Sequence, residues 1–379
     1  PPNKRLETPG LTHTTSFRGA QKVSTKRFYT GLAFCFVIAL LAAPFPRIAM
    51  WVGFLFAAYS VIANDSIQTL GTFLAANRER SAWTLWCFVA GLLLATSLFS
   101  WCEYGGDVTF QRLTAKGFEN APTDFTFLQV AAPLFLLVLT RKAIPVSTTF
   151  LILSAFAASV ESIGDVIGKS LSGYYLAFAC SLVLWLVTAD WTRTILKGKP
   201  ARFWYPVQWM TSGMLWSVWV MQDAANVAIY LPRKLGFYEF CAFGAILAGA
   251  LFVLMKNRGG EIQEVLTEKC QTTDIRQATF INLVYAGILY YFKVVSPTPM
   301  STTWVFIGLL AGREIAMRLR NDSDRSWGHV FKLVGKDLMK VALGLGVSIL
   351  LAIWINPVVR QEVAEMLHHV PIAVSQVGF

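Results

Sequence analysis

Charged side chains are scarce in this sequence. Asp, Glu, Lys and Arg account for 15% of the 379 residues, against roughly 25% in a typical soluble domain, and 55% of the residues are hydrophobic. This composition excludes an ordinary soluble protein and predicts an all-α polytopic membrane protein that lies in a lipid bilayer. Apolar windows near the roughly 20 residues that cross a bilayer predict about eleven membrane segments. They lie at 28–45, 47–77, 82–101, 124–140, 144–162, 172–190, 204–232, 237–255, 277–295, 299–312 and 338–356.

Histidine and paired cysteine are also scarce. The six cysteines form no Cys-x-x-Cys pair, and the four histidines are His13, His329, His368 and His369. A zinc centre needs clustered ligands of these types, and a histidine-assisted nucleophile needs a histidine near the reacting group. The sequence therefore predicts that the protein is not an enzyme and that it needs no cofactor other than a coupling ion.

Acidic residues are fewer than basic ones, 22 against 33, which gives a net charge of +11. We expect no nucleic-acid partner, because most Lys and Arg residues fall in loops predicted to be cytoplasmic, as the positive-inside rule requires. This topology places the N-terminus in the cytoplasm and the protein in the plasma membrane, or in the inner membrane of a bacterium. It gives a cytoplasmic tail at 1–27, a transmembrane domain at 28–356 and a C-terminal tail at 357–379. Residues 103–123, which include Arg112 and Lys116, form the largest predicted external loop.

A polar motif occurs twice within the apolar segments. An Asn-Asp-x-x-Gln sequence at 64–68 is followed by Pro-Val-Ser-Thr-Thr at 145–149, and Gln-Asp-x-x-Asn at 222–226 is followed by Pro-Met-Ser-Thr-Thr at 299–303. A charged group in a membrane helix costs roughly 2.5 to 3.5 kcal/mol on insertion scales, so its presence points to a function. One such aspartate alone would more often be a structural, hydrogen-bonded carboxylate. Its repetition with the same neighbours favours a binding site.

The duplicated motifs divide the chain into two repeats, at about 47–190 and 204–356. Each repeat contains five predicted segments, and an odd number of crossings makes the second copy enter the membrane from the opposite side. We therefore expect inverted repeats that meet near the middle of the membrane.

Two predicted segments, 47–77 and 204–232, are longer than a crossing requires and carry the aspartate motifs in mid-course. Broken helices or re-entrant elements would explain this length, because unpaired backbone groups are tolerated at membrane depth where they line a polar cavity. The Ser-Thr-Thr sequences follow Pro145 and Pro299, and proline favours the first turn of a helix. Helix starts attract anions through their free N–H groups.

Carboxylates and amide carbonyls are hard oxygen ligands of the kind that bind alkali cations or protons in transporters. Two converging Ser-Thr-Thr helix starts could hold a tetrahedral oxyanion without a buried Lys or Arg. Two buried carboxylates beside phosphate would be untenable in a medium of low dielectric unless cations or protons entered with the anion. The chemistry therefore predicts coupled entry.

These motifs resemble those of the inorganic phosphate transporter (PiT) family, over residues 47 to about 356. Each half of such a protein carries Gly-Ala/Gly-Asn-Asp-Val-x-Asn and a later Pro-x-Ser-Thr-Thr. The first family motif is matched by Ala63, Asn64, Asp65, Gly71 and Thr72, and the second by Asp223 and Asn226. The sequence departs from the pattern at Gln68, Phe150, Met221, Gln222 and Trp304.

The resemblance implies a symporter of inorganic phosphate, with Na⁺ as the favoured coupling ion and H⁺ as the alternative. It implies anion binding by Ser147, Thr148, Thr149, Ser301, Thr302, Thr303, Gln68 and Asn226, and cation binding by Asn64, Asp65, Gln222 and Asp223. If the ion is Na⁺, Asp65 and Asp223 are its expected metal ligands. Three alternatives stay open: transport of sulfate or another small oxyanion, an anion sensor that no longer transports, and a membrane enzyme acting on lipid. The third lacks a plausible nucleophile with a base. Alternating access often involves a dimer, so a homodimer is also considered.

Overall fold

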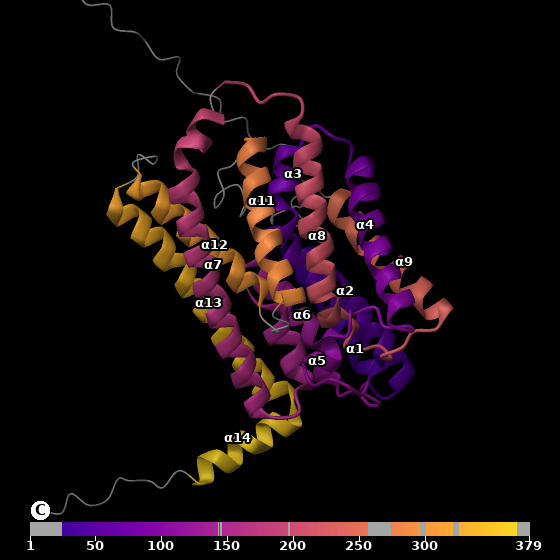
Figure 1. Ribbon diagram of the computed structural model, residues 1–379. Coiled ribbons are helices and arrows are strands. Elements are labelled where there is room, and N and C mark those ends of the chain that lie inside the picture. Colours follow the sequence, from indigo (N-terminus) through magenta and orange to yellow (C-terminus); the bar gives the residue numbers. More distant parts are fainter. Residues whose placement is uncertain are drawn as a thin grey trace, which may run out of the picture.

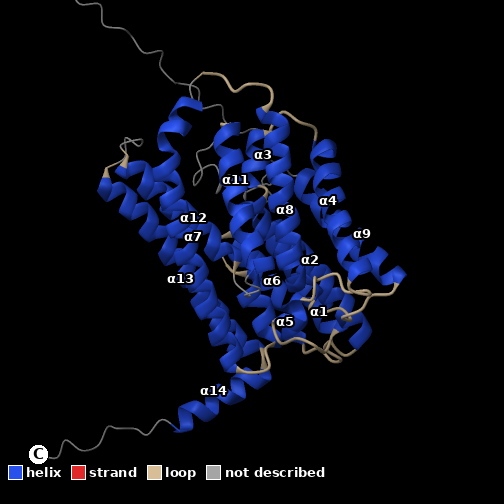
Figure 2. Ribbon diagram, in the orientation of Figure 1, coloured by secondary structure: helices blue, strands red, loops and turns tan. Residues whose placement is uncertain are grey.

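The computed structural model describes residues 25–142, 144, 146–195, 198–256, 274–295, 301–320 and 326–369. Several sequence predictions fall outside these residues: the tail before residue 25, Pro145, Pro299 and the chain after residue 369. Within the described ranges every regular element is helical, which confirms the predicted all-α class (Figure 2).

The elements follow one another as a bundle of helices joined at two opposite ends (Figure 1). Their bounds are α1 Thr25–Ala42, α2 Pro46–Thr69, α3 Gly71–Ala76, α4 Ala82–Glu103, α5 Arg112–Ala115, α6 Phe127–Arg141, η1 Thr149–Leu153, η2 Ser154–Phe156, α7 Val160–Ile195, α8 Trp204–Ala228, α9 Phe237–Lys256, α11 Ile275–Tyr290, η3 Tyr291–Val295, α12 Thr302–Leu319, α13 Trp327–Ile355 and α14 Pro357–His369.

Local signals explain many of the helix starts. Pro46 occupies the first turn of α2, where its missing N–H costs nothing. Thr126 and Gln129 form a reciprocal capping box at the start of α6. Ser81 and Ser326 cap α4 and α13 through their side chains.

Six of the described helices are long and apolar enough to cross a membrane by length and composition: α1, α2, α4, α7, α9 and α13. Large apolar side chains remain exposed on their outer faces, such as Leu41 on α1, Val187 on α7 and Leu350 on α13. A surface of this kind suits contact with lipid tails, because the tails are as apolar as these side chains.

The helix pairs repeat between the two halves of the chain. Within the halves, α2 packs on α6 and α8 packs on α11; between them, α2 contacts α9 and α8 contacts α4. The later elements also pack across the two halves. Helix α12 of the second half packs on α7 of the first, and η1 of the first half packs on α13 of the second. In Figure 1, α3 and the loop that enters α8 both lie at the top, so α2 runs toward that end and α8 runs away from it.

The predicted helix breaks lie elsewhere than expected. Helix α2 continues through Asn64 and Asp65 and ends at Thr69, and α8 continues through Asp223 and ends at Ala228. The motifs therefore occupy the last turns of regular helices, and the first break follows at Leu70, before α3. Side chains supply most of the hydrogen bonds to the motif carboxylates, and the backbone at the motifs stays helical.

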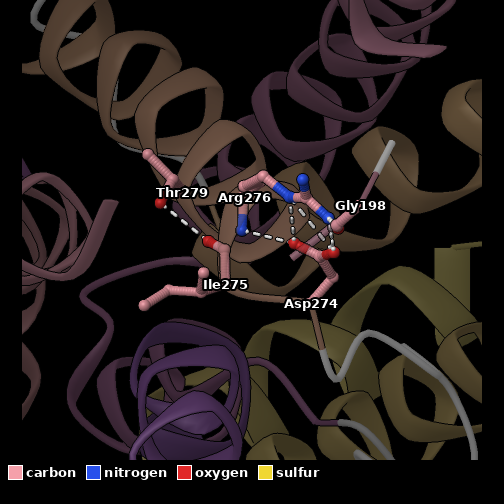
Figure 3. A network of polar contacts seen from close by, with 5 residues as sticks. All are labelled: Gly198, Asp274, Ile275, Arg276 and Thr279. Carbon is pink, nitrogen blue, oxygen red and sulfur yellow. Dashed lines mark hydrogen bonds and ion pairs between the residues drawn. The ribbon is translucent and has the colours of Figure 1, made fainter. Parts of the chain in front are cut away.

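A polar cluster fixes the end of the bundle that lies near the α7–α8 connection (Figure 3). Asp274 caps α11 by accepting from the Arg276 backbone N–H at 2.8 Å and forms an ion pair with the Arg276 guanidinium at 2.6 Å. Arg276 Nη2 also donates to the Gly198 carbonyl at 3.0 Å. Burial acts to raise the pKa of Asp274, but the hydrogen bonds from Arg276 outweigh it and hold the pKa below its ordinary value. This cluster ties the start of α11 to the α7–α8 connection.

Candidate functional site

The predicted site residues converge in one buried region. Helices α2 and α8 bring the two aspartate motifs there on their last turns, while η1 and α12 bring the Ser-Thr-Thr sequences at or just before their starts. All twelve are buried, with none more than 6% exposed: Asn64, Asp65, Gln68, Ser147, Thr148, Thr149, Gln222, Asp223, Asn226, Ser301, Thr302 and Thr303. Residues separated by up to 239 positions in sequence thus share one polar cluster in an apolar bundle.

Asp65 lies at the centre of the first half-site, which we define as Asn64, Asp65, Thr148 and Trp219. Its Oδ1 accepts from Asn64 Nδ2 at 2.7 Å, and its Oδ2 accepts from Thr148 Oγ1 at 3.1 Å and from Trp219 Nε1 at 3.2 Å. All three donors are neutral. They solvate the carboxylate without supplying a compensating charge.

Asp223 lies at the centre of the second half-site, which we define as Gln222, Asp223, Asn226 and Thr302. Its Oδ1 accepts from Asn226 Nδ2 at 2.9 Å, and the carboxylate also interacts with the Thr302 hydroxyl. Among the described residues, Asp223 Oδ2 has no hydrogen bond of standard geometry, although it is buried. A buried carboxylate oxygen in this state is an unsatisfied acceptor, which a cation or a proton could satisfy.

Reciprocal hydrogen bonds join the two half-sites. Asn226 Nδ2, from the second half, donates to Thr148 Oγ1 at 2.9 Å, and Gln68 Nε2, from the first half, donates to Thr302 Oγ1 at 3.4 Å. Asn226 Nδ2 also reaches Thr149 Oγ1 at 3.2 Å. The amide of each half therefore donates to the threonine that interacts with the aspartate of the other half, Thr148 beside Asp65 and Thr302 beside Asp223.

The two Ser-Thr-Thr sequences differ in local structure. Ser301 caps α12, because its Oγ accepts from the Trp304 backbone N–H at 3.4 Å, and this helix start agrees with the prediction. Ser147 Oγ accepts from the Phe150 N–H at 3.3 Å, but η1 is a single π-helical turn. Thr303 Oγ1 donates to the Val146 carbonyl at 3.4 Å, which joins the two sequences directly.

Two cations reach the second half-site from residues 103–123, the segment predicted to be an external loop. Arg112, which is 2% exposed, donates from Nη2 to Gln222 Oε1 at 2.5 Å. Lys116 donates from Nζ to Asn226 Oδ1 at 3.3 Å. The sequence suggested that the anion site could lack a buried Lys or Arg, but the structure places the buried Arg112 beside it. The Gln222 carbonyl, which was assigned to cation binding, accepts from the Arg112 guanidinium.

Sequence reasoning also missed two neutral members of the site. Trp219 was not among the predicted site residues, but its indole donates to Asp65, and its ring stacks on Trp216 with centroids 4.5 Å apart. Thr140 Oγ1 donates to Asn64 Oδ1 at 3.1 Å. The position of Trp219 one helical turn before Asp223 was a usable signal, because a buried indole N–H needs an acceptor. No comparable sequence signal marked Arg112 and Lys116 as site residues, since basic residues are common in polar loops.

Comparisons with known proteins agree with this architecture. No family model and no curated protein sequence matches the chain. A solved structure titled "The sodium-dependent phosphate transporter" superimposes with a TM-score of 0.57, covering 88% of this chain and 99% of that chain at 14% sequence identity. The two proteins share a fold. Six of the described helices are also long and apolar enough to cross a membrane, so the likeness supports an integral membrane protein with this all-α fold.

The geometry defines what the site can do. Two buried carboxylates, four amides and six hydroxyl groups provide oxygen ligands for cations and hydrogen-bond donors for an anion. They come from elements of both halves, so relative movement of the halves would reshape the site. Such an arrangement suits the binding of a small ion pair more than a covalent reaction.

Proposed function

We propose that this protein is a cation-coupled symporter of inorganic phosphate that works by alternating access between two inverted repeats. The observation that carries this proposal is the pair of reciprocal amide–threonine bonds, Asn226 to Thr148 and Gln68 to Thr302, around two buried aspartates. A site divided between two halves can open to either side when the halves move relative to each other. The opposite directions of α2 and α8 and the repeated helix pairs support inverted repeats.

Residue roles follow from donor and acceptor chemistry. The hydroxyl groups of residues 147–149 and 301–303, together with the amides of Gln68 and Asn226, would donate to the phosphate oxygens. Asp65 and Asp223, with Asn64 and Gln222 beside them, would bind the coupling cations. Na⁺ is the favoured ion because the structural neighbour is titled a sodium-dependent transporter; H⁺ is the alternative, because a proton can also neutralise a buried carboxylate.

Electrostatics supports coupling. Hydrogenphosphate carries two negative charges, and at this site the positive charges of Arg112 and Lys116 are already offset by two buried carboxylates. The attraction that compensates such charges in a medium of low dielectric has to come from cations or protons close by. Phosphate binding without an accompanying cation is therefore expected to be weak.

Purified protein in liposomes tests the proposal. Uptake of radiolabelled phosphate and sulfate should be measured under imposed Na⁺ or H⁺ gradients. We expect phosphate uptake driven by Na⁺ and its loss in both Asp65→Asn and Asp223→Asn, with Asp165→Asn, at a position near the start of α7, as a matched control. Uptake of sulfate in place of phosphate would favour the oxyanion alternative. Binding of phosphate without uptake would favour a sensor, and full activity of both aspartate variants would refute the site.

The remaining expectations belong to the same proposal: a cytoplasmic N-terminus, a plasma-membrane location, no enzymatic activity and a homodimer. Cross-linking in intact membranes would test the dimer, and protease accessibility of the N-terminus would test the orientation.

A further inference from the structure

The two half-sites are not electrostatically equivalent. Asp65 accepts from three neutral donors, whereas Asp223 lies near Lys116 and Arg112, which both act on its charge. The segment that carries these cations, residues 104–118 between α4 and α6, lies in the first half of the sequence but serves the aspartate of the second half. Repetition of the motifs therefore does not extend to their counter-charges.

Lys116 is one amide group away from the Asp223 carboxylate. Its Nζ contacts Asn226 Oδ1 at 3.3 Å, and Nδ2 of the same amide donates to Asp223 Oδ1 at 2.9 Å. Arg112 holds the neighbouring Gln222 through its carbonyl oxygen. A polarised amide between a cation and a carboxylate transmits their attraction, since hydrogen bonds in series strengthen one another.

Residues 104–118 are anchored to the bundle at several points. Arg233 donates from Nε to the Phe118 carbonyl and from Nη2 to the Asn120 carbonyl, both at 2.8 Å. Burial lowers the pKa of Arg233 to about 10, which still leaves it protonated at neutral pH. The Gly106 carbonyl accepts from the Leu235 N–H at 2.9 Å, and a Cβ at Gly106 would meet the Leu235 backbone at 3.1 Å.

The backbone immediately before Arg112 is strained. Phe110 and Gln111 have φ values of 53° and 61°, in the left-handed region that bulky residues avoid. Such strain persists only where the surrounding contacts over-determine the conformation, and it is typical of functional positions. Here it turns the chain so that Arg112 enters the bundle.

The two half-sites and the cations beside them contain equal numbers of acidic and basic side chains. When both are ionised, Asp65 and Asp223 contribute two negative charges, and Arg112 and Lys116 contribute two positive ones. These four charges cancel, so the cluster is tolerable before any ion binds. Bound hydrogenphosphate would then require fewer cations from solution than two isolated carboxylates would demand.

We propose that the Lys116 ammonium is a built-in counter-cation for Asp223, taking the place of one coupling cation at the second half-site. This inference rests on the proposed function for the identity of the cation. In the first half-site the cation must come from solution, whereas in the second it is part of the chain. Removal of the ammonium should free Asp223, whose buried Oδ2 accepts no hydrogen bond of standard geometry from the described residues, to bind an additional cation.

The decisive experiment counts Na⁺ sites in purified protein by equilibrium binding of radiolabelled Na⁺. We expect Lys116→Gln to bind an additional Na⁺ per chain, compared with the wild type, and Lys116→Arg to resemble the wild type. Lys234→Gln is the matched control, because it removes the same charge from an exposed position at the same end of the bundle. The double variant Lys116→Gln/Asp223→Asn should lose the additional site. Lys116→Met, which keeps the aliphatic stem, replaces the glutamine variant if that does not fold.

Liposome uptake gives an independent second measurement. Phosphate uptake by Lys116→Gln should depend more steeply on Na⁺ than uptake by the wild type or by Lys234→Gln. An unchanged number of Na⁺ sites would overturn the inference, as would a higher half-saturating phosphate concentration with unchanged Na⁺ dependence, which would make Lys116 an anion ligand. An absence of wild-type uptake, with the additional Na⁺ site still present in the variant, would refute the proposed function and leave the counter-cation in place.

Discussion

The contact between α7 and α12 depends on two glycines, and their replacement by alanine is expected to separate these helices. Gly308 and Gly312 lie one turn apart on α12 and face the α7 backbone. A Cβ added at Gly308 would collide with the Tyr174 carbonyl oxygen, and one at Gly312 with the Phe178 carbonyl oxygen. Because the obstacles are backbone atoms of another helix, no rotamer change relieves the clash. Small residues at this spacing allow close helix approach in membranes.

The magnitude follows from two opposing terms. Overpacking costs about 1–3 kcal/mol per added group, and alanine favours a helix over glycine by up to about 1 kcal/mol. Gly346→Ala on α13 has the same gain in helix propensity as Gly308→Ala but no clash, because nothing lies within 4 Å of its added Cβ. The difference in stability between the two variants therefore reports the clash alone. We expect Gly308→Ala to be less stable than Gly346→Ala by about 1–3 kcal/mol.

Unfolding by a denaturing detergent, followed by helical circular dichroism, measures this difference. Phosphate uptake supplies a second measurement. Thr302 and Thr303 are the first residues of α12, so a displaced α12 would carry them away from the first half. Gly308→Ala should therefore lower uptake, whereas Gly346→Ala should leave it unchanged. Equal stability of the two variants would show that α7 and α12 do not approach as closely as described, and would refute the reasoning.

Two further predictions concern single polar contacts. Trp219→Phe keeps a ring but removes the N–H donor to Asp65, and a hydrogen bond to a charged group contributes about 1.5–3 kcal/mol. The ligand-free variant should therefore lose that much free energy of unfolding. A loss near zero would mean that other groups solvate Asp65. Asp274→Asn should destabilise the protein at neutral pH. The folded-state pKa of Asp274 is depressed by Arg276, so its contribution is present above the unfolded-state value of about 3.9 and is lost as pH falls through the folded-state pKa. Thermal unfolding of the wild type and the variant should therefore converge below about pH 4, and a gap that stays constant there would contradict the ion pair.

Much of the architecture could be predicted from the sequence because bilayer crossing imposes a length and a composition. The predicted segment 82–101 corresponds to α4, and 237–255 corresponds to α9, each within two residues at both ends. The convergence of the two motifs was predictable for another reason. A costly group that appears twice with the same neighbours is retained for a shared site, and the structure brings Asp65 and Asp223 close enough to interact electrostatically.

Other features depended on contacts that sequence spacing does not encode. A broken helix was expected at Asp65 because a buried carboxylate needs donors, and unwound backbone could have supplied them. The donors come instead from side chains on three elements, among them Trp219 of the other half, 154 positions away. Similarly, the loop that contains Arg112 has no apolar periodicity to indicate that it enters the bundle. Its placement depends on strained φ values and on backbone contacts with the α8–α9 connection.

The amides exchange places between the halves, and this exchange explains how a duplicated site can become asymmetric. Asn226 in the second half occupies the position of Gln68 in the first, and its shorter side chain donates to Asp223 while its carbonyl accepts from Lys116. Both amides reach across to a threonine of the other half, Asn226 to Thr148 and Gln68 to Thr302, but among the described residues only Asn226 also contacts an aspartate and a lysine. The same fold therefore holds one carboxylate among neutral donors and the other beside cations. Since a carboxylate with a neighbouring ammonium attracts a second cation less strongly than one without, Asp65 is the half-site at which Na⁺ concentration should act first.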